Sequence, residues 1–366
     1  MTQNRTDFLS KGMNYGKLSA FFLAFITLVG VVFVLQELME VLLPLVFAMI
    51  LSQLFKPLVS FLRVRRVPLA VCILLVLLIV GAFLGGISLI ITGGIQNIVA
   101  QAPNYQGNFQ QLVQSVDQLL TELSGKLGRH VAHIDLTESI QLSSVTSFLA
   151  SGAGSFFSLL TNMFLMFLFL IFLLLGSEDF STKVYSAFST EDSYRLTQIL
   201  AQINSGIRRY LVTKTLINVA VAGVTVVVLL LFGVDFPLFI GTLTFFLNYI
   251  PNLGPLIAVL LPVLSCILGG QSWGLVLSLL GVLIVLHSVI GNFFEPKLMG
   301  SSLDLSPLVV LLSLIFWGWV WGVWGMVLAI PITSMIKIVC EHIVPLQPIA
   351  LLMGTVSHGE PEKEPR

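Results

Sequence analysis

DFPLFIGTLTFFLNYIPNLGPLIAVLLPVLSCILGG, residues 235–270, has no charged side chain after its first residue, and none follows before Glu295. A run this apolar belongs in the hydrocarbon of a membrane. Its middle nevertheless carries five residues that an uninterrupted spanning helix avoids: Asn248, Pro251, Asn252, Gly254 and Pro255. Prolines remove backbone donors, and the carbonyls freed in this way cannot face lipid. The sequence therefore predicts a broken helix at membrane depth. Transporters build solute sites this way, and a proline kink packed between neighbouring helices explains the spacing equally well.

The composition of the whole chain places it in a membrane. Of 366 residues, 56% are hydrophobic and 10% are charged, whereas soluble proteins carry about 25% charged residues. We therefore expect an all-α, polytopic integral membrane protein in contact with membrane lipid. Eighteen basic and eighteen acidic residues balance, which argues against a nucleic-acid partner. Cys72, Cys266 and Cys340 are far apart and form no CxxC pattern, so neither a metal nor a cofactor is expected.

Apolar runs and polar segments alternate in a pattern that predicts about eight transmembrane helices, with broken or re-entrant segments in the C-terminal half. Lys and Arg gather in the segments that an internal N-terminus would place inside, so both termini are expected in the cytoplasm. The expected divisions are N-terminal transmembrane helices at 1–92, a polar amphipathic extracytoplasmic segment at 93–150, a fourth helix at 151–176, a cytoplasmic amphipathic segment at 177–214, C-terminal helices with the NYIPNLGP break at 215–345, and a tail at 346–366.

Motifs for catalysis and for nucleotide-driven pumping are missing from the sequence. There is no GxxxxGK[ST] phosphate loop, no HExxH and no GxSxG, although each of these chemistries depends on its motif. The sequence therefore favours a channel or a secondary carrier over an enzyme.

Polar side chains in or beside the apolar runs are the candidates for function, because burying an ionisable group in a membrane is expensive. Glu295 and Lys297 flank Pro296, so an ion pair at a helix end explains them as well as a functional site does. His287 titrates near neutral pH and is a candidate proton relay, while a neutral packing histidine is the simpler interpretation. The polar candidates are Asn248, Asn252, His287, Asn292, Glu295, Lys297 and Asp304.

Three segments carry a family resemblance: NYIPNLGPLIAVLLPV at 248–263, GNFFEPKLMGSSLDLSPLVVLLSLIFWGW at 291–319 and GMVLAIPITSMIKI at 325–338. With these motifs the chain resembles the autoinducer-2 exporter family of bacterial inner-membrane proteins over residues 18–344. The resemblance implies an all-helical carrier, homo-oligomeric, that exports the small polar signal autoinducer-2. Within the matching motifs, the candidate positions for solute binding are Asn248, Pro251, Asn252, Gly254, Pro255, Asn292, Glu295 and Pro296.

Two other functions stay open at this point. Some members of the family are associated with sodium(lithium)/proton antiport, which needs a titrating carboxylate, and the candidates for ion coupling are His287, Glu295 and Asp304. The third hypothesis is a membrane scaffold that transports nothing and binds a partner through its amphipathic segments.

Overall fold

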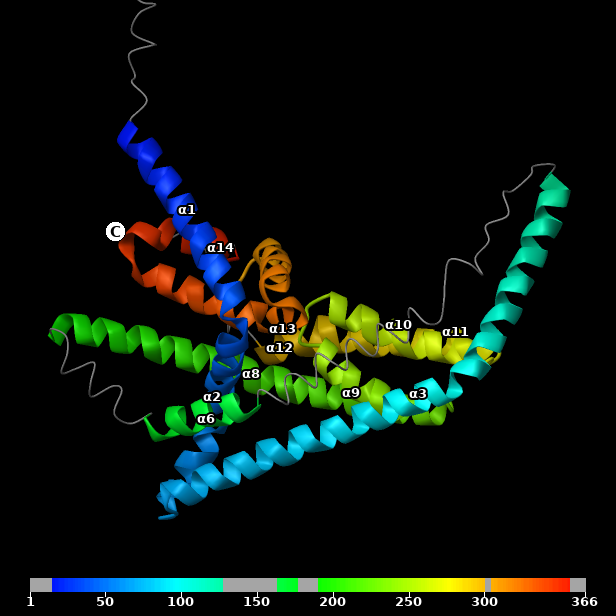
Figure 1. Ribbon diagram of the computed structural model, residues 1–366, viewed down its shortest axis with the longest axis horizontal. Coiled ribbons are helices and arrows are strands. Elements are labelled where there is room, and N and C mark those ends of the chain that lie inside the picture. The colour runs from blue at the N-terminus through cyan, green and yellow to red at the C-terminus, as the bar shows by residue number, and fades with distance from the viewer. Residues whose placement is uncertain (1–14, 128–162, 177–189, 300–303, 356–366) are drawn as a thin grey trace, which may run out of the picture.

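The computed structural model describes residues 15–127, 163–176, 190–299 and 304–355, and within these ranges it contains helices and turns but no strand. The predicted all-α class is confirmed (Figure 1). The elements in chain order are α1 (Tyr15–Glu37), α2 (Met39–Val64), α3 (Leu69–Leu127), α6 (Met163–Leu175), α8 (Thr190–Leu231), α9 (Pro237–Leu247), α10 (Leu253–Leu268), α11 (Trp273–Val289), the π-helical turn η1 (Ile290–Phe294), α12 (Glu295–Met299), α13 (Pro307–His342), the 3₁₀ turn η2 (Val344–Leu346) and α14 (Gln347–Met353).

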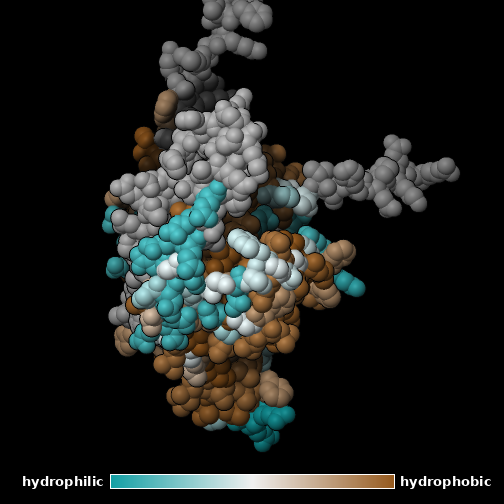
Figure 2. Space-filling view, turned by 90° about the vertical axis from the view of Figure 1, so that its right-hand side faces the viewer, coloured by the Kyte–Doolittle hydropathy of each residue, from teal (hydrophilic) through white to brown (hydrophobic). Residues whose placement is uncertain are grey.

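Several of these helices suit a bilayer. Within the described ranges, five are long and apolar enough to cross a membrane, by length and composition: Met39–Val64, Leu69–Gln111, Leu196–Leu231, Trp273–Leu298 and Pro307–His342. Their outer faces carry large apolar side chains, and Figure 2 shows hydrophobic residues over much of the described surface in that view. Leu78 is 64% exposed and Leu231 is 80% exposed. An apolar surface of this extent marks contact with lipid, so the polytopic membrane class is confirmed.

The predicted division of the chain into six segments, and the number of spans, remain predictions. Two helices pass through the proposed boundaries without interruption, since α3 continues beyond residue 93 and α8 continues beyond residue 215. The later part of α3 extends away from the other helices (Figure 1).

The three largest hydrophobic clusters among the described residues hold the bundle together. The first joins α2, the start of α3, and α6 around Val76 and Leu170, which are both completely buried. The second joins the middle of α3 to the end of α8 and to α9, α10 and α11 around Leu229 and Leu279. The third packs α1 and α2 on α13. The N-terminal helices and the C-terminal half therefore meet along α2 and α3.

Helix α13 consists of two helical arms joined by a sharp turn. Backbone angles leave the helical region at Trp321 (φ −128°, ψ 17°) and Gly322 (φ 62°, ψ −144°). A Cβ atom on Gly325 would lie 1.8 Å from the carbonyl oxygen of Trp317, so only glycine fits where the arms meet. The indole of Trp317 donates to the hydroxyl of Thr333 across the arms at 3.2 Å. Residues 307–342 therefore form a helical hairpin.

Candidate functional site

The stretch that the sequence predicted to be broken is a second helical hairpin, formed by α9 and α10. The two ends of the hairpin meet at its base: a Cβ atom added to Gly269 would lie 3.5 Å from the carboxylate of Asp235. Helix α3 holds this base: the Tyr105 hydroxyl donates to Asp235 at 2.9 Å, and the Asn108 amide donates to the Leu268 carbonyl at 2.8 Å. At 11 and 16 residues, each arm is shorter than the ~20 residues that span a bilayer. The two arms therefore form a re-entrant hairpin, which enters the bilayer and returns to the same side.

The tip of this hairpin, residues 248–252, is tightly constrained. Asn252 has φ 61° and ψ −48°, and the Leu253 N–H donates to the Pro251 carbonyl at 2.6 Å, so Asn252 is the centre of a γ-turn, which is a rare and strained conformation. A Cβ on Gly254 would lie 1.9 Å from the carbonyl oxygen of Leu247, so glycine is required where the second arm leaves the first. Asn252 is exposed, and Pro251 and Pro255 are half-buried. Asn252 and Gly254 thus shape the turn.

Asn248 differs from the rest of the tip because its side chain faces inward. It is 5% exposed, and its Nδ2 has no hydrogen-bond partner among the described residues. An unpaired buried donor costs about 1–3 kcal/mol. The two asparagines that the sequence placed together therefore occupy different environments, and only Asn248 offers an unused polar group to the interior.

Helix α8 presents a buried polar stripe to this tip, which the sequence analysis did not identify. Tyr210, Lys214, Asn218 and Thr225 are at most 4% exposed, and the first three are spaced four residues apart, which puts them on one face of the helix. The signal was present as polar residues at helical spacing. The predicted boundary between the cytoplasmic segment 177–214 and the following helices falls at Lys214 and divides this pattern.

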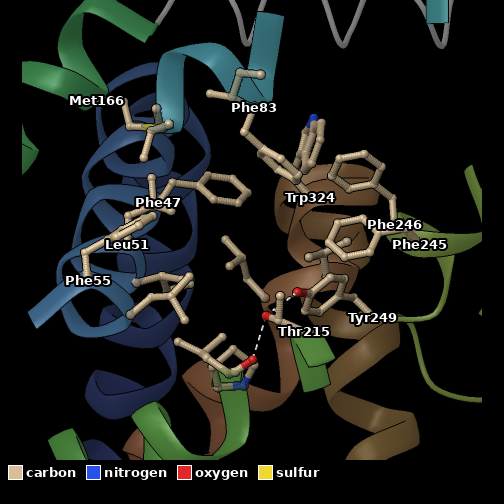
Figure 3. Close-up of a pocket in the computed structure, with 18 of the residues that line it drawn as sticks. Phe47, Leu51, Phe55, Phe83, Met166, Thr215, Phe245, Phe246, Tyr249 and Trp324 are labelled. Carbon is tan, nitrogen blue, oxygen red and sulfur yellow. Dashed lines mark hydrogen bonds between the residues drawn. The ribbon is translucent and has the colours of Figure 1, made fainter. Parts of the chain in front are cut away.

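Direct contacts join the stripe to the hairpin. The Asn218 amide donates to the carbonyl of Phe245 at 3.2 Å, one turn before Asn248, while its Oδ1 has no partner among the described residues. One turn along α8, the hydroxyls of Thr215 and Tyr249 lie 2.7 Å apart, as Figure 3 shows. A buried acceptor on Asn218 and a buried donor on Asn248 are thus both left open where α8 meets the hairpin.

Glu295 is paired with the stripe and not with its neighbour in sequence. The Lys214 ammonium donates to the Glu295 carboxylate, and the side chain of Lys214 is 5% exposed while that of Glu295 is 29% exposed. The interpretation of Glu295 and Lys297 as a helix-end pair is therefore wrong: α12 packs on α8, and Lys297 is exposed. The charge of Glu295 is neutralised inside the bundle.

The remaining candidates in α11, η1 and α12 form no hydrogen bond or ion pair with the polar stripe of α8 among the described residues. His287 is half-buried, and its Nε2 has no partner among the described residues. Asn292 lies in η1, and both Asn292 and Pro296 are exposed.

Asp304 lies at the base of the α13 hairpin. The Lys337 ammonium donates to Asp304 at 2.8 Å, and the hydroxyl of Thr355 donates to the other carboxylate oxygen. These two bonds, that of Lys337 first, lower the pKa of Asp304 below its ordinary value. Lys337 is also 3.1 Å from Glu341. Asp304, which precedes the first arm of the α13 hairpin, is therefore bonded to the second arm through Lys337 and to the segment after α14 through Thr355.

The chemistry available at the α8–hairpin contact is that of neutral hydrogen bonding. Amides and hydroxyls offer both donors and acceptors, and the nearby charges of Lys214 and Glu295 cancel. Across the described ranges, no group of three His, Cys, Asp or Glu side chains is placed to hold a metal ion. The arrangement suits an uncharged molecule with hydroxyl or carbonyl groups.

Comparisons with known proteins agree with this architecture. Residues 20–345 match the family described as AI-2E family transporter. The AI-2 transport protein TqsA of Escherichia coli K12 is 30% identical over 325 residues, covering 87% of this chain and 90% of that protein. A putative transport protein of Borreliella burgdorferi is 26% identical (85% and 84% covered), and the putative transport protein YhhT of Escherichia coli K12 is 27% identical (90% and 91%). The chain belongs to the AI-2E transporter family and, with its long apolar helices, is a multi-pass protein of the bacterial inner membrane.

Proposed function

We propose that this protein exports a small polar solute, with autoinducer-2 as the first candidate, and that the solute binds between α8 and the tip of the α9–α10 hairpin. The observation that carries the proposal is the pair of unused groups there, Asn218 Oδ1 and Asn248 Nδ2. Most buried polar groups in folded proteins are hydrogen-bonded, and a solute with hydroxyl groups would supply a partner to each of these two. The similarity to TqsA supports autoinducer-2 as that solute.

The other residues of the predicted site take different roles in this proposal. Pro251, Asn252, Gly254 and Pro255 set the shape of the tip. Glu295 and Lys214 form a neutral wall beside the solute, and Asn292 and Pro296 belong to the irregular segment that carries Glu295. Transport through such a site requires no catalytic group.

The arrangement in the membrane is part of the same proposal. We infer that both termini are cytoplasmic because basic residues gather in the segments that this orientation places inside. We also infer a homo-oligomer. The exposed apolar faces of the helices support it, because helices with such faces associate with one another as well as with lipid.

Uptake of labelled autoinducer-2 into inverted membrane vesicles tests the proposal. Vesicles with the protein should take up more than vesicles without it. Asn248→Ala should lower the uptake roughly fivefold through the loss of one hydrogen bond. Asn252→Gly is the matched control, since it removes an amide from the same tip while glycine tolerates the positive φ, and its uptake should stay near that of the wild type. Equal uptake by wild type and Asn248→Ala would contradict the site.

An uncoupler separates two modes of transport. Uptake that collapses when the proton gradient is removed indicates a proton-linked exporter, and His287 becomes the next residue to replace. Uptake that persists indicates a facilitator that works through the amides alone.

Sodium(lithium)/proton antiport is the second candidate, and the Lys214–Glu295 pair is the observation that favours it, because a cation that displaces Lys214 would meet a carboxylate. Vesicles that take up no autoinducer-2 but acidify or alkalinise on a sodium pulse would place antiport first. Glu295→Gln should then abolish the exchange. Exchange that survives this substitution with an unchanged pH profile would exclude Glu295 as the coupling group.

A further inference from the structure

A cavity of about 340 Å³ lies beside the polar stripe, enclosed by α2, α3, α6, α8, α9 and α13. Figure 3 shows it between Phe47, Leu51 and Phe55 of α2 on one side and Trp324, Phe245 and Phe246 on the other. Its volume falls within the ~300–1,000 Å³ typical of ligand pockets. It is also separate from the open amides of Asn218 and Asn248, neither of which lines it.

The walls of this cavity are almost entirely hydrocarbon and aromatic ring. Tyr210, Thr215 and Tyr249 contribute its hydroxyl groups, and the other lining side chains are apolar or, in Trp324, aromatic with one ring N–H. Such walls hold water poorly. A solute rich in hydroxyl groups would lose its hydration there without replacement. The small polar solute of the proposed function therefore does not fit this cavity.

Access to the cavity is from the bilayer side. Ile79 and Phe83 line it from α3, yet they are 41% and 52% exposed. Their neighbour Leu78 also faces outward. Since the outer face of α3 is a lipid-facing surface, an apolar molecule dissolved in the bilayer reaches the cavity without crossing water.

The hydroxyl groups of the residues that line the cavity leave a single hydroxyl donor unused. The Thr215 hydroxyl lies 2.6 Å from the Leu211 carbonyl and gives its one proton there. Tyr249 must then be the donor in its 2.7 Å contact with Thr215. The hydroxyl of Tyr210 is left with no partner among the described residues, on a side chain that is 2% exposed. Tyr210 is therefore the hydroxyl donor available to an acceptor oxygen of a ligand.

We propose that this cavity binds an amphiphile from the membrane, a hydrocarbon chain that ends in an ester or carbonyl oxygen, with the chain among the aromatic walls and the oxygen on Tyr210. The occupant lies between the N-terminal helices and the C-terminal half and touches Tyr249, which belongs to the tip of the α9–α10 hairpin. The site stands whether or not autoinducer-2 is the exported solute, because it shares no open group with the proposed solute site.

Fluorescence of Trp324 provides the test, because bromine on a lipid chain quenches tryptophan only at close range. The background variant carries Trp273→Phe and Trp319→Phe, since these two indoles are 63% and 66% exposed and would report bulk lipid. The probe is the methyl ester of a dibrominated fatty acid, added to the detergent-purified chain. Quenching should saturate with probe concentration, and Trp324→Phe on this background should remove the saturable part. Quenching that persists without Trp324, or never saturates, overturns the proposal.

Two further variants distinguish the contribution of the ligand's hydrocarbon chain to binding from that of its oxygen. Leu51→Phe narrows the cavity and should weaken binding of the ester roughly tenfold or more. Tyr210→Phe keeps the volume but removes the donor, so it should weaken the ester roughly fivefold and leave a dibrominated alkane of equal length unaffected. A Tyr210→Phe variant that binds ester and alkane as the wild type does would overturn the assignment of the oxygen to Tyr210.

Quenching of Trp324 in nanodiscs made with dibrominated phosphatidylcholine identifies the source of the amphiphile. Quenching of Trp324 that unbrominated ester relieves supports a phospholipid chain as the occupant. Trp324 that is unquenched in these discs, yet quenched by added ester, supports a free amphiphile.

Discussion

The two helical hairpins of the C-terminal half are built alike but finish differently at their tips. Each turns at a glycine pressed against a carbonyl of the other arm, Gly254 against Leu247 at 1.9 Å and Gly325 against Trp317 at 1.8 Å. At the α13 tip the indole of Trp321 donates to the carbonyl of Leu35 in α1 at 2.9 Å. At the α9–α10 tip the amide of Asn248 donates to nothing among the described residues.

This difference separates a structural tip from a candidate functional one. The α13 hairpin is tied at its tip to α1, across its arms by Trp317 and Thr333, and at its base by Asp304 and Lys337. The α9–α10 hairpin is tied at its base by Tyr105 and Asn108 of α3, and near its tip α8 bonds to Phe245 and Tyr249. A tip that retains an open amide can offer it to a solute.

The largest effect is expected where the two hairpins are alike. Gly254→Ala and Gly325→Ala each force a Cβ into a backbone carbonyl, so each should destabilise the protein by about 3–5 kcal/mol. Cys72, Cys266 and Cys340 are buried, so reaction with a thiol dye during heating reports unfolding. Gly281→Ala is the control, because nothing lies within 4 Å of its Cβ position. A hairpin glycine that tolerates alanine as Gly281 does would show that its arms separate in solution.

The ion pairs give the next largest difference. Glu295→Gln leaves Lys214 buried without its carboxylate and should cost about 2 kcal/mol. Asp304→Asn should cost about 1 kcal/mol or less, because Asp304 is 45% exposed and Lys337 keeps Glu341 at 3.1 Å. The same thermal assay measures both, and Lys214→Met combined with Glu295→Gln should recover part of the loss. The reverse order of the two losses would contradict this ranking.

The sequence predicted the α9–α10 break because its causes are local. Pro251 and Pro255 remove donors, Gly254 permits the close approach, and the lack of charge places them in a membrane. The partner of Glu295 was not predictable in this way, because Lys214 lies 81 residues away and only the packing of α12 on α8 joins them. The unequal burial of Asn248 and Asn252 also depends on tertiary contacts, which no spacing encodes.

Because the amide of Asn248 is unpaired, substitutions at the two tips should change the stability of the protein in opposite directions. Asn248→Leu replaces an unpaired buried group by an apolar side chain of similar size and should stabilise the protein by about 1 kcal/mol while solute uptake falls. Trp321→Phe removes a satisfied bond and should destabilise it by about 1 kcal/mol. Thermal unfolding and vesicle uptake are measured on the same preparations. If Asn248→Leu lowers stability, the amide has a partner in the membrane and the comparison between the tips fails.

The smallest effect concerns the base of the α13 hairpin and depends on pH. Lys337 and Thr355 lower the pKa of Asp304, so the carboxylate contributes stability above its unfolded pKa, near 3.9, and loses it as the pH falls through the lower folded value. The difference in melting temperature between wild type and Asp304→Asn should stay constant from neutral pH to about pH 5 and shrink below about pH 4. Among the described contacts, no lysine or arginine pairs with the base of the α9–α10 hairpin. Asn108→Ala should therefore lower the melting temperature by the same amount at neutral pH and below about pH 4. A constant difference for Asp304→Asn down to the lowest pH would mean that the ion pair does not hold the α13 base.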